Sequence, residues 1–171
     1  KSKGGDETVN AVRRVAQALH VATVVQQKLT TAPTTQIAVL GDLNDYEGSA
    51  PIEALRNGVQ PPLIHLYDYL PRRDRYTYIF NGGSQVLDHL LVTPKLARLV
   101  ALVDPVHTNA DFPGDGQTQV QTLTHASDHD PVQVVLRPDG AAILGGSLRY
   151  ANIHVQLLDE RGVVVNETNT D

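Results

Sequence analysis

A short apolar run that stops at a glycine constrains this chain most. Residues 37–40 are Ile, Ala, Val and Leu, and the polar stretch Gly-Asp-Leu-Asn-Asp follows at 41–45. Such a run predicts a strand buried on both faces, in the middle of a sheet that other layers cover. If the backbone stays extended past Gly41, Asp42 and Asn44 project from one face at the carboxyl end of the strand, where open α/β sheets place their ligands. On its own, however, Asp-x-Asn is more often a turn closed by side-chain to backbone hydrogen bonds.

Composition narrows the chemistry. The chain has 171 residues, enough for one domain and part of a second, and its net charge of -5 gives no broad positive field for nucleic acid. A phosphate substrate would therefore need a divalent cation between it and the carboxylates. The absence of cysteine excludes disulfides, thiolate nucleophiles and cysteine-based metal sites. No apolar run approaches the roughly 18 residues of a membrane span, so none is expected.

Periodicity predicts the helices. Apolar residues at intervals of three and four predict a helix over residues 6–29, whose buried stripe consists of Val12, Ala16, Leu19, Ala22, Val25 and Leu29. Residues 50–56 read as a second, short helix that Pro51 starts. Residues 94–97 read as a single helical turn.

Four further strands are predicted, over residues 76–80, 86–92, 99–103 and 132–136. The sequence Asn81-Gly82-Gly83 is the strongest hairpin signal in the chain and predicts that the first two of these strands pair. The polar stretch 104–124 is expected to be irregular.

A domain boundary is predicted after Arg137. Residues 1–137 form the first region, and residues 138–171 form a linker and the start of a small β-sandwich-like module. Within the second region, Ile153, Val155 and Leu157 alternate with polar residues, and a turn leads into the valines at 163–165. This pattern predicts one β hairpin, which is too little for a stable domain by itself.

Three polar interruptions of apolar segments stand out: Asp42 with Asn44, Asp88 with His89, and Asp128 with His129. Taken singly, each is commonly a satisfied structural pair. Carboxylates on three buried strands would cost several kcal/mol without partners, so a shared site that pairs them and holds a metal is the economical explanation.

The ordered set Gly-Asp-Leu-Asn at 41–44, Leu-Asp-His at 87–89 and Ser-Asp-His-Asp-Pro at 127–131 resembles the endonuclease/exonuclease/phosphatase superfamily, which includes deoxyribonucleases, sphingomyelinases and inositol polyphosphate phosphatases. Lys-Ser-Lys-Gly-Gly at 1–5 and Tyr-Thr-Tyr at 76–78 look most like its large secreted bacterial nucleases. The resemblance covers residues 1–136. It implies an α/β fold that is half of a four-layer α/β sandwich, deoxyribonuclease-like, followed by the C-terminal β hairpin.

The resemblance implies roles for the first and last motifs. Asp42 would position or deprotonate the attacking water, and Asn44 would orient that water and the phosphate. Asp128 would help to hold a divalent metal, expected to be Mg²⁺, with Mn²⁺ or Ca²⁺ as alternatives.

The resemblance also implies that His129 contacts the scissile phosphate and that Asp88 pairs with His129. The pairing is physically reasonable, because a carboxylate beside an imidazole fixes its tautomer and favours the cationic, doubly donating ring. His89 and His125 receive no catalytic role.

A small basic cluster is a candidate for substrate contacts. Arg72, Arg73 and Arg75, together with Tyr78, are expected to approach substrate phosphates, although a solvated loop would have the same composition. The expected activity is metal-dependent phosphodiester hydrolysis by a secreted bacterial nuclease acting on DNA or RNA, with or without attachment to the cell surface. The alternatives are a phosphatase or sphingomyelinase-type phosphodiesterase on the same fold, and a non-catalytic, excised interaction module.

One departure from the superfamily is large. Its metal-binding glutamate, an asparagine and a first catalytic histidine belong to an N-terminal half that has no match in this sequence. The chain is therefore expected to hold half of the active site and to be inactive alone. Its open sheet face is expected to be covered by that missing half or by another chain.

Overall fold

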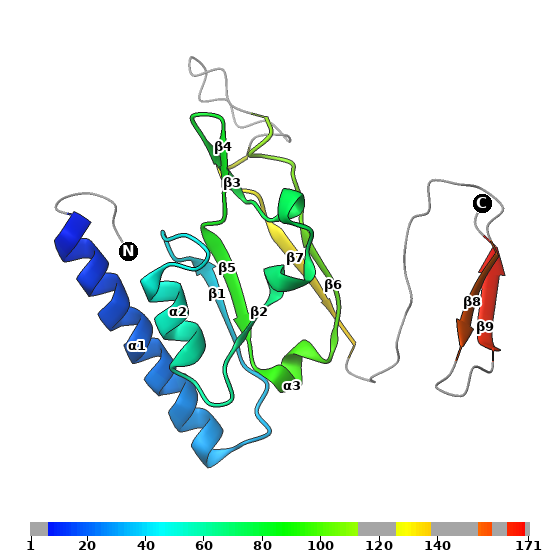
Figure 1. The fold of residues 1–171 in the computed structure, drawn as a ribbon, viewed down its shortest axis with the longest axis horizontal. Helices are drawn as coiled ribbons and strands as arrows, with labels where there is room; N and C mark the ends of the chain where they lie inside the picture. Colours follow the sequence, from blue (N-terminus) through cyan, green and yellow to red (C-terminus); the bar gives the residue numbers. More distant parts are fainter. Residues whose placement is uncertain (1–6, 113–125, 138–153, 159–163, 170–171) are drawn as a thin grey trace. The chain divides into compact units, whose positions relative to one another are not determined.

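The computed structural model describes residues 7–112, 126–137, 154–158 and 164–169, with the last two stretches described as backbone only. It divides the chain into two compact units, Lys1–Gly140 and Ala141–Asp171. The first unit combines helices with antiparallel sheets (Figure 1), so the mixed α/β class is confirmed. Among the described residues, no helix has the length and apolar character needed to cross a membrane.

Within the described residues, three α-helices lie where periodicity and start signals predict them. Helix α1 spans Glu7–Thr31, α2 spans Ala50–Asn57 and α3 spans Pro94–Ala97. Both short helices carry a proline in their first turn, where its missing N–H costs no hydrogen bond. Two short 3₁₀ helices, η1 (Leu66–Tyr69) and η2 (Arg72–Asp74), were not predicted.

The prediction of the buried stripe of α1 is only half correct. Ala22, Val25 and Leu29 are buried in a core formed with α2 and the sheet, whereas Val12 is 69% exposed and Leu19 48% exposed. At its N-terminal end the helix instead buries Arg14, four residues away from the partly buried Ala18. The prediction failed there because it counted only apolar residues, and an ion pair allows a charged one to be buried.

The main sheet has the order β1-β5-β2 (Figure 1). Strand β1 (Ala38–Asp42) and strand β2 (Ile64–His65) both run antiparallel to β5 (Asp88–Val92). The register pairs Asp42 with Asp88 at one end of the sheet. The sheet thus brings the first two candidate motifs together.

Strand β1 is not buried on both faces, so this prediction is wrong for the described residues. Val39 packs into the core that α1 and α2 cover, but Leu40, which points to the opposite face, is 65% exposed. Within the part of the chain that the structure describes, β1 is also an edge strand, because it pairs with β5 alone.

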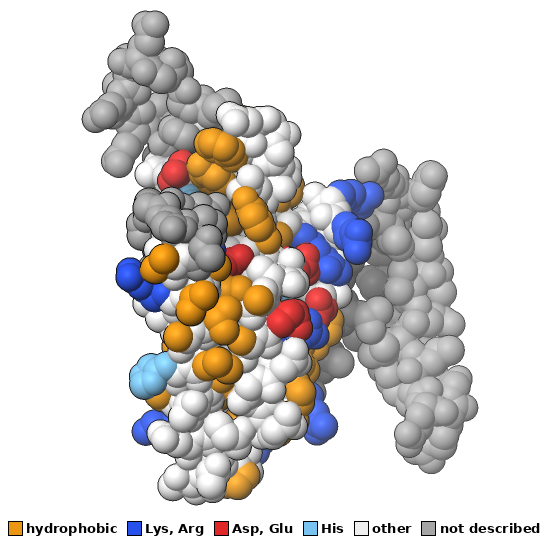
Figure 2. Space-filling model, turned by 60° about the vertical axis from the view of Figure 1, so that its left-hand side comes forward, with side chains coloured by type: hydrophobic (Ala, Val, Ile, Leu, Met, Phe, Trp, Pro, Cys, Tyr) orange, Lys and Arg blue, Asp and Glu red, His pale blue; other side chains and the backbone are white. Residues whose placement is uncertain are grey.

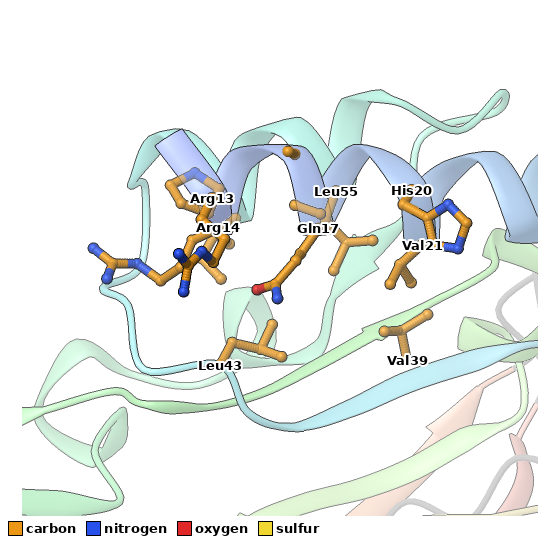
Figure 3. Close-up of a pocket in the computed structure, with 12 residues that line it drawn as sticks. Arg13, Arg14, Gln17, His20, Val21, Val39, Leu43 and Leu55 are labelled. Carbon is orange, nitrogen blue, oxygen red and sulfur yellow. The ribbon is translucent and has the colours of Figure 1, made fainter. Parts of the chain in front are cut away.

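An apolar groove of about 600 Å³ lies between α1, β1 and α2. In the close-up, Val21 of α1 faces Val39 of β1, and Arg13 and Arg14 lie near one end (Figure 3). The space-filling view that brings the α1 side forward shows hydrophobic side chains gathered on this face (Figure 2). The groove and the exposed side of β1 leave apolar surface uncovered by the described residues.

The Asn-Gly turn forms, but its partner strand is a different one from that predicted. Strand β3 (Tyr78–Phe80) pairs with β4 (Gly83–Gln85) around Asn81 and Gly82, both of which have positive φ, as this turn requires. The predicted partner strand, residues 86–92, is wrong, because Phe80 pairs with Gly83 and the pairing ends at Gln85. The hairpin therefore ends before the buried residues Val86 and Leu87. Strand β5 then crosses to β1 and β2.

Strands β6 (Val100–Pro105) and β7 (Val132–Leu136) form an antiparallel pair, which confirms both predicted strands. Strand β6 extends two residues into the stretch predicted to be irregular, and residues 113–125 lie outside the described residues. A second core joins η1, β5, α3 and β6 around Tyr67 and Val103.

In the second unit, β8 (His154–Leu158) pairs antiparallel with β9 (Val164–Asn169). The predicted hairpin is therefore confirmed. The predicted linker and the turn at 159–163 lie outside the described residues.

Candidate active site

The carboxyl end of β1 carries a closed Asp-Asn pair. The Asp42 carboxylate accepts hydrogen bonds from the Asn44 backbone N–H at 2.8 Å and from the Asn44 side-chain amide at 2.7 Å. The strand ends at Asp42, and Asn44 has a φ of 52°, so the backbone does not stay extended as far as Asn44. A turn forms instead, as side-chain to backbone bonding favours, and it keeps the two side chains in contact.

Gly41 makes this turn possible. Its φ of 135° lies in a region that residues with a side chain rarely adopt. Glycine therefore allows β1 to end by presenting Asp42 at the edge of the sheet.

Asp88, at the start of β5, holds His129. One of its carboxylate oxygens lies 2.6 Å from Nδ1 of His129 and 2.7 Å from the hydroxyl of the buried Thr77. An ionised carboxylate only accepts, so Nδ1 of His129 is the donor and Nε2 is the ring nitrogen left to act on another group. Thr77 was not foreseen, although it lies within the Tyr-Thr-Tyr segment.

The segment before β7 is fixed against β3. His129 forms a β bridge with Tyr78, and their rings stack with centroids 4.8 Å apart. The Asp130 backbone N–H donates to the Thr77 carbonyl at 2.7 Å. Tyr78 therefore supports the imidazole of His129 from one side, a contact that the sequence did not reveal.

Asp130 anchors the neighbouring loop. Its buried carboxylate accepts from the backbone N–H groups of Asn109 and Ala110 and contacts Nδ1 of His107 at 2.9 Å. Burial alone would raise the pKa of Asp130, but these hydrogen bonds outweigh it and hold the pKa below its usual value. Asn109 in turn donates to the His129 carbonyl at 2.8 Å. Sequence reasoning missed this role, even though Asp130 belongs to the last motif.

The expected metal ligand lies beside His129 in the sequence. Asp128 is exposed, on the segment between Ser127 and His129. Ser127 braces this segment by accepting a hydrogen bond from the His129 backbone N–H at 3.1 Å. Asp128 thus has a solvent-exposed side chain at the residue that precedes His129.

The three arginines expected to contact phosphate differ in their exposure and in the contacts that they already make. Arg72 and Arg73 are exposed on η2, and Arg73 has a loose pair with Asp74 at 3.5 Å. Arg75 is tied down, because it donates to the Leu70 carbonyl at 2.7 Å and pairs with Glu47 at 3.2 Å. Arg75 therefore has a structural role in this loop, which makes it the weakest of the three candidates for contacting phosphate.

A series of buried hydrogen bonds links His65 and His89 to Asp45, the residue that follows the Asp42–Asn44 turn. Nε2 of His65 contacts Nδ1 of His89 at 2.9 Å, and Nε2 of His89 contacts the Asp45 carbonyl at 2.9 Å. The Asp45 side chain forms a buried ion pair with Arg14 at 2.8 Å. Burial lowers the pKa of both histidines, and the neighbouring His89 contributes to bringing the pKa of His65 to about 4. His89 is thus a structural residue, and no pattern in the sequence pointed to His65.

His65, at one end of this series of hydrogen bonds, also belongs to a group of residues of the kinds that bind metals. Glu47, His65 and Asp68 each offer one ligand atom, and these atoms lie within 4.8 Å of one another. The group could hold a metal ion, and it does not include Asp128.

The histidine pair predicts a pH dependence of stability. Unfolded His65 takes up a proton below about pH 6.5, but folded His65 does so only below about pH 4. Between these values the unfolded state binds more protons, so the free energy of unfolding falls as the pH is lowered from 6.5 to 4. A shift of this size corresponds to roughly 3 kcal/mol.

Urea unfolding at pH 7 and pH 4.5 measures this effect. The wild-type chain and the control His20→Gln, which changes an exposed histidine of α1, should both lose stability over this range. His65→Gln should lose clearly less between the two pH values. An equal loss in His65→Gln and the wild type would contradict the prediction.

Comparison of the chain with protein-family models, with curated proteins and with solved structures found no match.

Proposed function

We propose that this chain is the C-terminal half of a metal-dependent phosphodiesterase with a deoxyribonuclease-like, four-layer fold, a secreted nuclease that acts on DNA or RNA. One observation carries the proposal. The Asp42–Asn44 pair and the Asp88–His129 pair, which are far apart in the sequence, are built on neighbouring strands whose register places Asp42 opposite Asp88. Phosphodiester hydrolysis requires such groups together: one to activate a water molecule and another to stabilise charge on the phosphate.

Each residue then has a role. Asp42 accepts a proton from the attacking water. Asn44, which Asp42 holds in place, orients the same water molecule. The Asp88 carboxylate accepts from Nδ1–H of His129, so Nε2 of His129 faces the phosphate. In the doubly protonated ring that this pairing favours, Nε2–H donates to an oxygen on which negative charge develops. Tyr78 limits rotation of the imidazole by stacking on it.

The metal would be held at Asp128. Mg²⁺ binds to oxygen ligands, and it commonly uses only one or two protein carboxylates and keeps several waters, so a single exposed carboxylate suits it as part of a larger ligand set. Bound there, the ion would neutralise charge on the phosphate beside His129. The remaining ligands would come from the N-terminal half of the domain.

Uncovered apolar surface supports the idea of a half-domain. Leu40 of β1 and Leu102 of β6 are 65% and 46% exposed, and the groove beside β1 is lined by Val21, Val39 and Leu43. Exposed apolar surface of this kind marks an interaction site in a protein that folds stably. A second sheet over β1 and β5 would bury Leu40 and complete the site around Asp42.

The proposal predicts that phosphate binds at His129. Titration of the ¹⁵N-labelled chain with inorganic phosphate, followed by NMR of the imidazole nitrogens, should shift the Nε2 signal of His129 and the side-chain amide signal of Asn44. The signals of His20 on α1 should not move. His129→Gln should remove the response at Asn44, and shifts equal at His20 and His129 would contradict the proposal.

A further inference from the structure

The group formed by Glu47, His65 and Asp68 contains none of the residues assigned to hydrolysis. Glu47 follows the Asp-Asn turn, His65 ends β2 and Asp68 lies in η1. Their ligand atoms lie within 4.8 Å of one another, a spacing that one small cation can span. The two carboxylates are exposed, whereas His65 is 2% exposed, so the group is open to solvent on one side only.

The hydrogen bonds of the buried histidines determine their tautomers. The Asp45 carbonyl only accepts, so Nε2 of His89 carries the proton and donates to it. With Nε2 of His89 donating, the Nδ1 of a singly protonated His89 is an acceptor and must receive a hydrogen from Nε2 of His65. A singly protonated His65 then has an unprotonated Nδ1 with its lone pair unused.

The lone pair on Nδ1 of His65 points to a ligand independently of the two carboxylates. Nδ1 of His65 is fully buried and has no hydrogen-bond partner among the described residues. Because Nε2 contacts His89, Nδ1 is the nitrogen of His65 that remains for binding a cation together with Glu47 and Asp68. A buried acceptor without a donor costs free energy, and a cation bound at this position would remove that cost.

We propose that Nδ1 of His65, with Glu47 and Asp68, binds a divalent transition metal, best suited to Zn²⁺. A neutral imidazole with two carboxylates is a zinc ligand set that leaves a fourth position for water, whereas Mg²⁺ and Ca²⁺ prefer oxygen ligands alone. The bond from His65 to His89 has the form typical of metal-bound histidine, in which the second ring nitrogen donates to an acceptor that orients the ring.

Two arginines position the carboxylates. Arg56 pairs with Asp68 at 2.8 Å and Arg75 pairs with Glu47 at 3.2 Å, each through one carboxylate oxygen. Each carboxylate has a second oxygen that can bind the metal. An ion bound here would join the loop after the Asp-Asn turn to η1, and it would therefore stabilise the structure behind Asp42 without touching the phosphate.

Calorimetric titration of the metal-free chain with Zn²⁺ tests the proposal, and Co²⁺ absorption reports the ligand geometry. One Zn²⁺ per chain is expected, together with a Co²⁺ spectrum of low coordination number. Glu47→Gln and Asp68→Asn change exposed side chains, so both should fold, and each should weaken Zn²⁺ binding at least about 10-fold. The control Glu53→Gln, on α2, should bind as the wild type does.

His65→Gln provides the sharpest comparison, with folding checked by circular dichroism. It should abolish the Co²⁺ spectrum. Binding that is unchanged in Glu47→Gln and Asp68→Asn, or that is lost in Asp128→Asn instead, would overturn the proposal, as would no Zn²⁺ binding at micromolar concentrations. None of these outcomes depends on hydrolytic activity.

Discussion

Replacing His129 with alanine is expected to lower the rate of phosphodiester hydrolysis by the completed domain about 1,000-fold. The reason is that the Asp88 carboxylate fixes Nδ1 of His129 at 2.6 Å, which leaves Nε2 as the ring nitrogen that can contact the phosphate. Without the imidazole, the charge that develops on the phosphate loses its donor. Rates of plasmid nicking at saturating and subsaturating substrate would measure the effect on kcat and KM separately.

His20→Ala is the matched control, because His20 is an exposed histidine on α1. It should leave the rate unchanged. Asp88→Asn should have a smaller effect than His129→Ala and should alter the pH profile, because the amide can present its N–H to His129 and favour the wrong tautomer. A His129→Ala variant that retained the wild-type rate would remove His129 from the mechanism.

Arg14→Ala is expected to destabilise the fold by about 3–5 kcal/mol. The side chains of Arg14 and Asp45 are 8% and 10% exposed and lie 2.8 Å apart, so the substitution leaves an uncompensated carboxylate in the interior. The backbone carbonyl of Asp45 also accepts a hydrogen bond from His89. Asp45 therefore joins α1, through Arg14, to β5, through His89, at the end of the Asp-Asn turn. Urea unfolding at pH 7 would measure the loss.

Arg13→Ala is the control for this variant. Arg13 neighbours Arg14 but is exposed, so its removal should change the free energy of unfolding by no more than about 0.5 kcal/mol. Equal stability of the two variants would show that the Arg14–Asp45 pair does not hold α1 in place.

The sequence was most informative where one local rule decided the structure. An early proline, Pro51, predicted α2, and the Asn-Gly turn between alternating residues predicted a hairpin at Asn81. The expected grouping of Asp42 with Asp88 is also seen, because Asp42 ends β1, Asp88 begins β5, and these two ends pair in the antiparallel sheet.

The sequence was least informative where distant partners decided the structure. Whether Arg14 is buried depends on Asp45, 31 residues later, and His65 becomes a buried acceptor only because His89 and Asp45 fix its tautomer. The exposure of Leu40 likewise depends on which elements cover the sheet, and a run of four apolar residues carries no such information.

The most direct test of the central claim is nicking of supercoiled plasmid with Mg²⁺, with Mn²⁺ and with EDTA, comparing this chain with the same chain extended N-terminally to a complete domain. The account predicts that the extended protein nicks DNA, that EDTA abolishes the activity and that the chain alone is inactive. An extended protein that folds but cleaves neither DNA nor RNA with any of these metals would contradict the nuclease assignment, and hydrolysis of inositol phosphates or sphingomyelin would then identify the substrate class.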